Sequence, residues 1–206
     1  MNVVFDFGAV LFSWRPADIL AETFPALVST PTDASALAKA VFGHADWHAF
    51  DQGLLAMDEV VDRTQQRLGL HGPTLKDMVA GIGERLRPID QSVDILDGLR
   101  QRRDAQQGVT GLYYLSNMPL PYARYLEAQH DFLHWFDGGI FSGDVRLIKP
   151  DPAIYQALQN RFDLAASRTV FIDDLFANVE SAQSLGWRGI HFQSPEQLKA
   201  ALNKHL

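Results

Sequence analysis

Carboxylates that directly follow short apolar runs are the first candidates for chemistry in this sequence. Asp6 follows the run 3–5, and the pair Asp173 and Asp174 follows the run 170–172. Clustered carboxylates repel one another unless a proton or a cation intervenes, and hard oxygen ligands of this type suit Mg²⁺. An aspartate after a strand can also simply cap a turn or a helix, so each acid taken alone leaves both interpretations open.

Two further polar groups are candidates for binding an anion. Ser116 and Asn117 follow the apolar run 112–115, and a hydroxyl, an amide and free backbone N–H groups can hold anionic oxygens. Lys149 precedes a stretch with two prolines, which stiffen the backbone and favour a helix start. In isolation, Ser-Asn is more often a turn and a lysine is more often a solvated surface charge.

The apolar runs themselves predict the sheet that positions these groups. Five short runs, rich in β-branched or aromatic residues, are expected to be buried parallel strands: 3–5, 112–115, 139–141, 170–172 and 190–192. Helical patterns lie between most of these runs. One covers 152–161, with Asp151 as its expected N-cap, and another covers 178–185, with Gly186 as its expected C-cap. Strands alternating with helices indicate an α/β fold, whose active-site edge lies at the carboxyl ends of the strands.

The alternation breaks between the first and second predicted strands. Residues 13–88 contain no convincing strand, and helical patterning covers 17–24, 34–42, 57–68 and 75–86, with turns expected at 30–33 and 71–73. This segment therefore predicts a helical insert of four helices. A closing helix is expected over 195–206, with basic residues near its end.

The order of the candidate residues resembles a known family. A strand-end aspartate, a Ser, a Lys and an acidic pair, here Asp6, Ser116, Lys149 and 173–174, resemble the motifs of the haloacid dehalogenase superfamily. The resemblance implies a Rossmann-like parallel-sheet core formed by residues 1–13 and 89–206. It also implies that residues 14–88 form an inserted helical-bundle cap, as in the subfamily whose cap lies between the first and second motifs. The stretch 47–53 is similar to cap sequences of that subfamily.

The resemblance also implies roles in phosphoryl transfer. Asp6 would be the nucleophile and form an aspartyl-phosphate. Ser116 and the backbone around Asn117 would bind the transferring phosphoryl oxygens, and Lys149 would neutralise charge between the phosphate and the nucleophile. The family thus implies a hydrolase that acts on a small phosphorylated metabolite.

A magnesium site follows from the same resemblance. Asp6, the backbone carbonyl of Gly8 and Asp174 would hold Mg²⁺ with help from Asp173, and Asp174 is favoured as the direct ligand because of its spacing to Asn178. The ion would screen the repulsion between an anionic nucleophile and an anionic substrate.

Gly8 departs from the pattern of the phosphatases in this family. Most of them have a second aspartate there that acts as general acid and base, and such a group contributes about 10²–10⁴-fold to the rate. Three consequences stay open: the substrate has a good leaving group, a cap residue supplies the proton, or the protein is a weak phosphatase. His44 and His48 are the first cap candidates, because histidine titrates near neutral pH.

Composition narrows the class of partner. The chain has 206 residues, 47% of them hydrophobic, no cysteine and a formal net charge of −7. Thiolate chemistry and disulfides are thereby excluded, and the acidity argues against nucleic acid or an anionic membrane as the main partner. No apolar run is long enough for a transmembrane helix, and no signal peptide is evident at the start, so a cytoplasmic location is expected.

Three functions fit this pattern of residues. The favoured one is a magnesium-dependent phosphatase, since the chain resembles bacterial sugar-phosphate phosphatase-like members of the family. A 2-haloacid dehalogenase also lacks the second aspartate but works without a metal, so the pair 173–174 argues against it. A binding or regulatory protein is the third. Trp14, His44, Trp47 and His48 are candidates for the substrate entrance, although tryptophans are more often packing residues.

Overall fold

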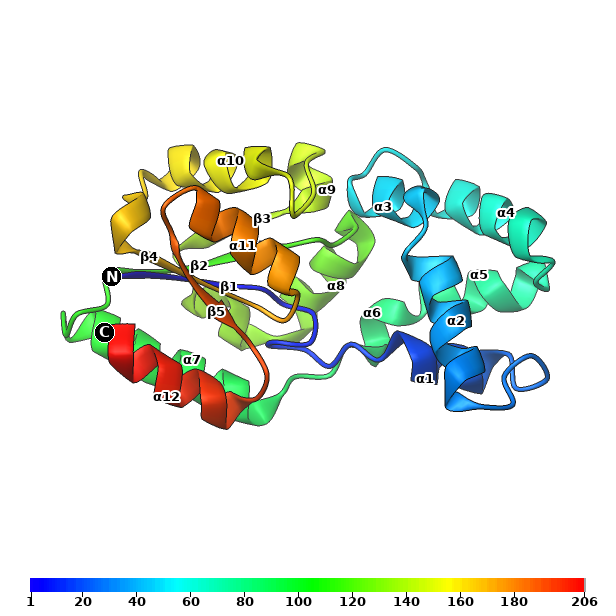
Figure 1. The fold of residues 1–206 in the computed structure, drawn as a ribbon, viewed down its shortest axis with the longest axis horizontal. Helices are drawn as coiled ribbons and strands as arrows, with labels where there is room; N and C mark the ends of the chain where they lie inside the picture. The colour runs from blue at the N-terminus through cyan, green and yellow to red at the C-terminus, as the bar shows by residue number, and fades with distance from the viewer. Residues whose placement is uncertain (206) are drawn as a thin grey trace.

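The computed structural model of the chain describes residues 1–205, which contain a five-stranded parallel sheet in the order β3-β2-β1-β4-β5. Each strand overlaps one of the five apolar runs, so the predicted α/β class and its strands are confirmed. In chain order the strands are β1 (Asn2–Phe5), β2 (Gly111–Ser116), β3 (Gly138–Phe141), β4 (Thr169–Asp173) and β5 (Arg188–His191). Figure 1 shows the sheet in the left half of the molecule, where the two termini also lie.

The pairing register brings the candidate residues to one edge. Phe5 at the end of β1 pairs with Tyr114 of β2 on one side and with Ile172 of β4 on the other. Because the strands are parallel and in step, the residues that follow Phe5, Tyr114 and Ile172 emerge together at the carboxyl edge of the sheet. Asp6 therefore lies between the end of β2 and the end of β4.

Alternating side chains of the central strands pack against two helical layers. Val3 and Phe5 face one cluster, which includes residues of α7 (Asp90–Asp104), α8 (Leu120–Gln129) and α12 (Pro195–His205) and continues into the helical segment. Val4 faces the other, formed with α10 (Pro152–Phe162) and α11 (Phe176–Ser184). Period-two alternation with both faces covered is the expected packing of a parallel strand. The predicted start of α10 is confirmed, because the Asp151 carboxylate accepts a 2.9 Å hydrogen bond from the Ala153 N–H.

The segment between β1 and β2 is helical, but it holds six helices before α7 instead of the four predicted. They are α1 (Pro16–Thr23), α2 (Pro31–Phe42), α3 (Ala45–Asp51), α4 (Met57–Leu68), α5 (Gly72–Ala80) and α6 (Ile82–Arg85). The single helix expected over 75–86 is interrupted at Gly81, and α3 has only two turns, too few for a periodic pattern. The turns expected at 30–33 and 71–73 are mostly helix starts, where Thr30 forms a capping box with Asp33.

Short elements complete the chain. They are the short helix α9 (Ser142–Val145) and the 3₁₀ segments η1 (Asp131–Trp135) and η2 (Ala166–Arg168). The closing helix predicted for 195–206 is observed as α12, and residue 206 lies outside the described residues. Within residues 1–205, none of the helices has the length and apolarity needed to cross a bilayer.

The two connections between the sheet and the helical segment run side by side. Ser13 N–H donates to the Arg87 carbonyl at 2.7 Å, and Ile89 N–H donates to the Leu11 carbonyl at 2.8 Å. Phe12 and Pro88 form an isolated antiparallel bridge between them. In Figure 1 the helices α1 to α6 form the right half of the molecule, reached through this pair of connections.

Candidate active site

Asp6 begins the turn that follows the central strand. Its N–H donates to the Ile172 carbonyl at 2.9 Å, which fixes its backbone to β4, and its Oδ1 accepts the Phe7 N–H at 2.7 Å. The residue is 7% exposed. Burial raises the pKa of Asp6 to about 7, against the opposing effect of Lys149. Additional positive charge near such a carboxyl would favour its ionised form.

The turn after Asp6 closes on itself. The Phe7 carbonyl accepts the N–H groups of Leu11 at 2.9 Å and Phe12 at 2.8 Å, and Ala9 has a left-handed backbone with φ of 56°. Gly8 lies beside Trp14, since a Cβ added to Gly8 would be 3.8 Å from the Trp14 Cβ. The space beside Gly8 is thus open to a side chain that this sequence lacks.

Lys149 carries the positive charge of the site. Its Nζ donates to the Leu115 carbonyl at 2.9 Å and to Asp173 Oδ2 at 2.7 Å, and it pairs with Asp6 Oδ1 at 2.9 Å. Burial alone would lower the pKa of Lys149, but the carboxylates of Asp173 and Asp6 raise it above its ordinary value. The ammonium is therefore held charged, with three acceptors for its three protons.

Asp173 is fully engaged with neighbouring groups. The Asn178 side-chain amide lies 2.9 and 3.0 Å from its two oxygens, the Leu175 N–H donates to Oδ1 at 2.8 Å, and Lys149 donates to Oδ2. Asp173 is also completely buried. Its position indicates a residue that orients the lysine, with little capacity left for a metal.

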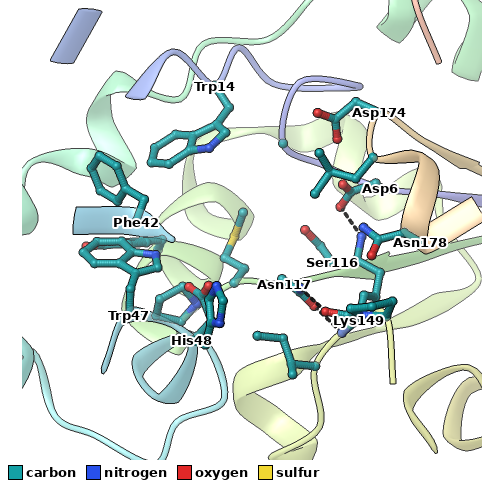
Figure 2. Close-up of a pocket in the computed structure, with 18 of the residues that line it drawn as sticks. Asp6, Trp14, Phe42, Trp47, His48, Ser116, Asn117, Lys149, Asp174 and Asn178 are labelled. Atoms are coloured by element: carbon teal, nitrogen blue, oxygen red, sulfur yellow. Dashed lines mark hydrogen bonds and ion pairs between the residues drawn. The ribbon is translucent and has the colours of Figure 1, made fainter. Parts of the chain in front are cut away.

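Asp174 is the carboxylate of the pair that lines the cavity. Burial is the larger cause and the negative charge of Asp173 the second, and together they raise the pKa of Asp174 to about 6. The Asp174 side chain lines the cavity. One carboxylate oxygen from each of Asp6, Asp173 and Asp174 lies within 4.8 Å of the other two. Two raised pKa values in a cluster of hard oxygen donors fit a divalent cation such as Mg²⁺, with Asp6 and Asp174 as the carboxylates best placed to hold it (Figure 2).

Ser116 and Asn117 lie where they were expected, at the end of β2 and in the cavity lining. The Asn117 side-chain amide makes two hydrogen bonds to the backbone of Lys149. Its Nδ2 donates to the Lys149 carbonyl at 3.1 Å, and its Oδ1 accepts the Lys149 N–H at 2.8 Å. The amide group therefore positions the lysine loop. Ser116 is 1% exposed and lies next to this amide in the chain.

A cavity of about 510 Å³ joins these groups to the helical segment. Its sheet side is formed by the polar residues at the strand ends. The cavity is also lined by large apolar and aromatic side chains from both halves of the molecule: Trp14, Phe42, Trp47, Ile82, Leu86, Met118, Tyr122, Ile148 and Leu175. Figure 2 shows Trp14, Phe42 and Trp47 facing the charged groups across open space.

The aromatic side of the cavity is a continuous series of edge-to-face contacts. Ring centroids are 5.1 Å apart for Trp14 and Phe42, 4.6 Å for Phe42 and Trp47, and 5.4 Å for Trp47 and Phe50. Phe50 continues the series to Tyr122 at 5.8 Å. We name Trp14, Phe42, Trp47 and Tyr122, which line the cavity, the aromatic wall. Such a wall is rigid and apolar, so it favours an organic group with little polar surface.

The entrance residues expected from the sequence are only partly brought together. Trp14, Trp47 and His48 line the cavity, and the tryptophans serve both packing and lining. His44 is not among the lining residues. Its Nδ1 accepts the Asp46 N–H at 3.1 Å at the start of α3, so the structure does not support it as a proton donor to a substrate.

Some site residues carry no clear signal in the sequence. In the sequence, Phe42 and Tyr122 are recognisable only as apolar aromatic residues. The packing of α2, α3 and α8, which the sequence does not show, brings them into one cavity wall. Asp51 lies inside the stretch 47–53 that resembles cap sequences, but nothing in that stretch shows that it lines a cavity. Asn178 has the expected spacing to Asp174, yet its contact is with Asp173.

Comparison with known proteins places the chain in a family. The family described as haloacid dehalogenase-like hydrolase matches residues 3–186. The sesquiterpene phosphatase astK of Aspergillus oryzae is 28% identical over 91% of this chain and 87% of its own length. The drimenol cyclase drtB of Aspergillus calidoustus is 26% identical over 97% of this chain, which spans only 35% of that protein.

Solved structures share the fold. A HAD family enzyme of Bacteroides thetaiotaomicron, solved as a magnesium complex, superposes with a TM-score of 0.73 at 18% identity, covering 98% of this chain and 97% of that one. L-2-haloacid dehalogenase of Xanthobacter autotrophicus superposes with a TM-score of 0.66 at 22% identity, covering 100% and 83%. With the family matched over most of its length and the same fold in these structures, this chain belongs to the haloacid dehalogenase-like hydrolases and is a hydrolase.

Proposed function

We propose that this protein is a magnesium-dependent phosphatase for small phosphate monoesters with an apolar organic group. The observation that carries the proposal is the position of Asp6, which lies between a fixed lysine and the cavity-lining carboxylate Asp174, at one end of an aromatic-walled cavity. A hydrolase with this arrangement has a nucleophile, a charge-neutralising group and a cation site close to one another.

The chemistry begins at Asp6. One carboxylate oxygen attacks phosphorus, the bond from phosphorus to the ester oxygen breaks, and the organic group leaves as an alcohol after taking a proton. Water then attacks the aspartyl-phosphate, which releases inorganic phosphate and restores the carboxylate. Mg²⁺, when bound, would offset the charge of both the nucleophile and the phosphate.

The surrounding residues orient the reaction. Lys149 holds Asp6 Oδ1 at 2.9 Å, which leaves the second oxygen to attack. Asp173 and Asn117 fix the lysine through its side chain and its backbone, respectively. Ser116 is assigned to donate a hydrogen bond to a phosphoryl oxygen. Asp174 and the Gly8 carbonyl complete the proposed magnesium ligands, which keeps the roles expected from the sequence.

The aromatic wall supports an apolar substrate. A sugar would expose several hydroxyl groups to Trp14, Phe42 and Trp47, whose faces and edges offer them little hydrogen bonding. The relative astK is a sesquiterpene phosphatase, and that name supports the same choice for this chain. We therefore favour alkyl, prenyl or aryl phosphates over the sugar phosphates that the sequence resemblance suggests.

The dehalogenase alternative has less support. The Xanthobacter dehalogenase shares the fold, but at 22% identity the likeness extends to the fold alone. A metal-free reaction would leave Asp174 and Asp6 with raised pKa values and no cation to offset their charge. The cluster is better explained by a metal-dependent phosphatase.

A substrate panel tests this proposal. The purified protein is assayed for phosphate release from alkyl, prenyl and aryl monophosphates and from sugar phosphates, and for halide release from 2-chloropropionate, with Mg²⁺ or with EDTA. We expect magnesium-dependent phosphate release, with kcat/KM rising as the organic group becomes more apolar. Halide release in EDTA would favour the dehalogenase, and a preference for sugar phosphates would contradict the role given to the aromatic wall.

A further inference from the structure

Asp51 is an acidic side chain in the cavity that the proposed chemistry does not use. It is the last residue of α3 and lines the cavity together with Trp47 and His48 of the same helix. The other acids of the lining, Asp6 and Asp174, belong to the proposed metal site at the sheet edge. Asp51 comes from the helical segment, which also supplies Trp14, Phe42 and Trp47 of the aromatic wall.

The backbone of Asp51 is fixed to the sheet half of the molecule. Its carbonyl accepts a 2.6 Å hydrogen bond from the Ser142 hydroxyl, and the oxygen of that hydroxyl accepts the Met118 N–H at 2.8 Å. Two residues further on, Gly53 has φ of 69°, and a Cβ there would lie 2.9 Å from the Gly143 carbonyl oxygen. Asp51 is therefore held at a set position relative to the loop that follows Ser116.

The Asp51 side chain lacks a partner within the protein. Across residues 1–205, no hydrogen bond or ion pair involves its carboxyl oxygens. The residue is half-buried, and its desolvation in the cavity raises the pKa of Asp51 well above its ordinary value. That shift favours the neutral acid, which does not repel a phosphate anion in the same cavity. A partly buried carboxyl group without a protein partner is free to bind a ligand, and a ligand group that hydrogen-bonds to it within the cavity is favoured.

Two other polar side chains near the aromatic wall are already engaged. The Tyr122 hydroxyl donates to the Val79 carbonyl at 2.7 Å, and the Asn117 amide is bound to the Lys149 backbone. Only a few convergent polar groups are expected in an apolar ligand cavity, where they set orientation and specificity. Asp51 is half-buried and fixed, whereas His48 is exposed.

We propose that Asp51 is a specificity residue that hydrogen-bonds to a hydroxyl or carbonyl group on the organic part of an otherwise apolar phosphate monoester. This inference rests on the proposed phosphatase function and narrows its substrate class. The favoured substrate is then polar at both ends, with phosphate at Asp6, an apolar body along the aromatic wall, and one hydrogen-bonding group at Asp51.

Matched substrates test the inference. The n-alkyl phosphates from about four to ten carbons are compared with the monophosphates of the corresponding terminal diols, by kcat/KM with Mg²⁺. At one or two chain lengths, the native enzyme should prefer the diol phosphate by about tenfold, the value of one added hydrogen bond. Asp51→Leu should abolish this preference and lower KM for the plain alkyl phosphate, because an apolar group then completes the wall.

Two further variants separate hydrogen bonding from other effects. Asp51→Asn keeps the shape, a donor and an acceptor, so it should retain most of the preference. Asp62→Asn removes an exposed carboxylate on α4 outside the cavity and should behave as the native enzyme. Far-UV circular dichroism and melting temperatures check folding, and Asp51→Ala replaces Asp51→Leu if the leucine variant does not fold.

The possible results have separate meanings. A native enzyme that hydrolyses both series with no preference at any length would overturn the inference and leave the phosphatase proposal intact. An equal fall in kcat on both series in Asp51→Leu would also overturn it, because the residue would then act in the chemistry. No magnesium-dependent phosphate release from either series would refute the proposed function, and the inference with it.

Discussion

Asp173 and Asp174 are adjacent in sequence and differ in what their side chains contact. The Asp173 oxygens accept hydrogen bonds from Lys149, Asn178 and the Leu175 N–H. Asp174, by contrast, lines the cavity together with Asp6. The backbone at the end of β4 directs one side chain into the protein and the next toward the cavity. The sequence alone could predict an acidic pair at a metal site, and the contacts divide the two roles.

This division predicts different results for the two amide variants. Asp174→Asn should weaken Mg²⁺ binding strongly while leaving stability nearly unchanged, because it removes a proposed ligand. Asp173→Asn should destabilise the fold by about 3–5 kcal/mol, since it breaks a buried ion pair with Lys149. Isothermal titration with Mg²⁺ and urea unfolding measure the two effects. Equal losses of Mg²⁺ affinity would show that the ligand is misassigned.

Gly8 gives a second prediction at this scale. A Cβ at Gly8 meets only Trp14, at 3.8 Å, so an aspartate side chain can be accommodated there. If the native site gives the leaving oxygen little proton assistance, Gly8→Asp should raise turnover on alkyl phosphates more than on aryl phosphates, within a range of about 10²–10⁴-fold. Rates are plotted against leaving-group pKa for both forms. A flat plot for the native enzyme would mean that another residue, with His48 as the first candidate, already supplies the proton.

At the scale of elements, the strands were predictable and the short helices were not. A buried parallel strand is a continuous apolar run, so β1, β2 and β4 are evident from residue type alone. The two-turn helix α3 has no such pattern, and its position depends on contacts with α9 that are distant in sequence. For the same reason the strand-end residues were predicted, while the aromatic wall was predicted only in part.

The contact between α3 and α9 makes a prediction about the Ser142 hydroxyl. It donates to the Asp51 carbonyl and accepts the Met118 N–H, and Ser142 is completely buried. Ser142→Ala leaves both backbone groups unpaired and should cost about 1–3 kcal/mol of stability per unsatisfied group. It should also raise KM more than it changes kcat, because the cavity wall loses its anchor to the loop that follows Ser116.

Ser184→Ala is the matched control, since Ser184 is exposed and its hydroxyl makes one local hydrogen bond to Ser181. It should leave both stability and KM close to native values. Urea unfolding and steady-state kinetics on both variants make the comparison. A Ser142→Ala protein as stable as the control would show that the α3–α9 contact contributes little.

At the scale of the molecule, the cavity is the product of two halves. The sheet edge supplies Asp6, Ser116 and Lys149, while the helical segment supplies Trp14 and Trp47. The two adjacent connections near Ser13 and Pro88 could act as a hinge between the halves. We therefore still predict that residues 14–88 form a cap that closes over the substrate. A cytoplasmic location also stays a prediction. Closure of such a cap would exclude water and admit only small substrates.

The central claim is that Asp6 becomes phosphorylated in a magnesium-dependent reaction. The most direct measurement is acid quenching of the enzyme during turnover of a ³²P-labelled alkyl phosphate, followed by counting label on the protein. We predict labelling of the native enzyme with Mg²⁺ that hydroxylamine removes, as it does from an acyl phosphate, and none in EDTA or in Asp6→Asn. Phosphate release at the native rate in EDTA or in Asp6→Asn, with no label on the protein, would contradict the account.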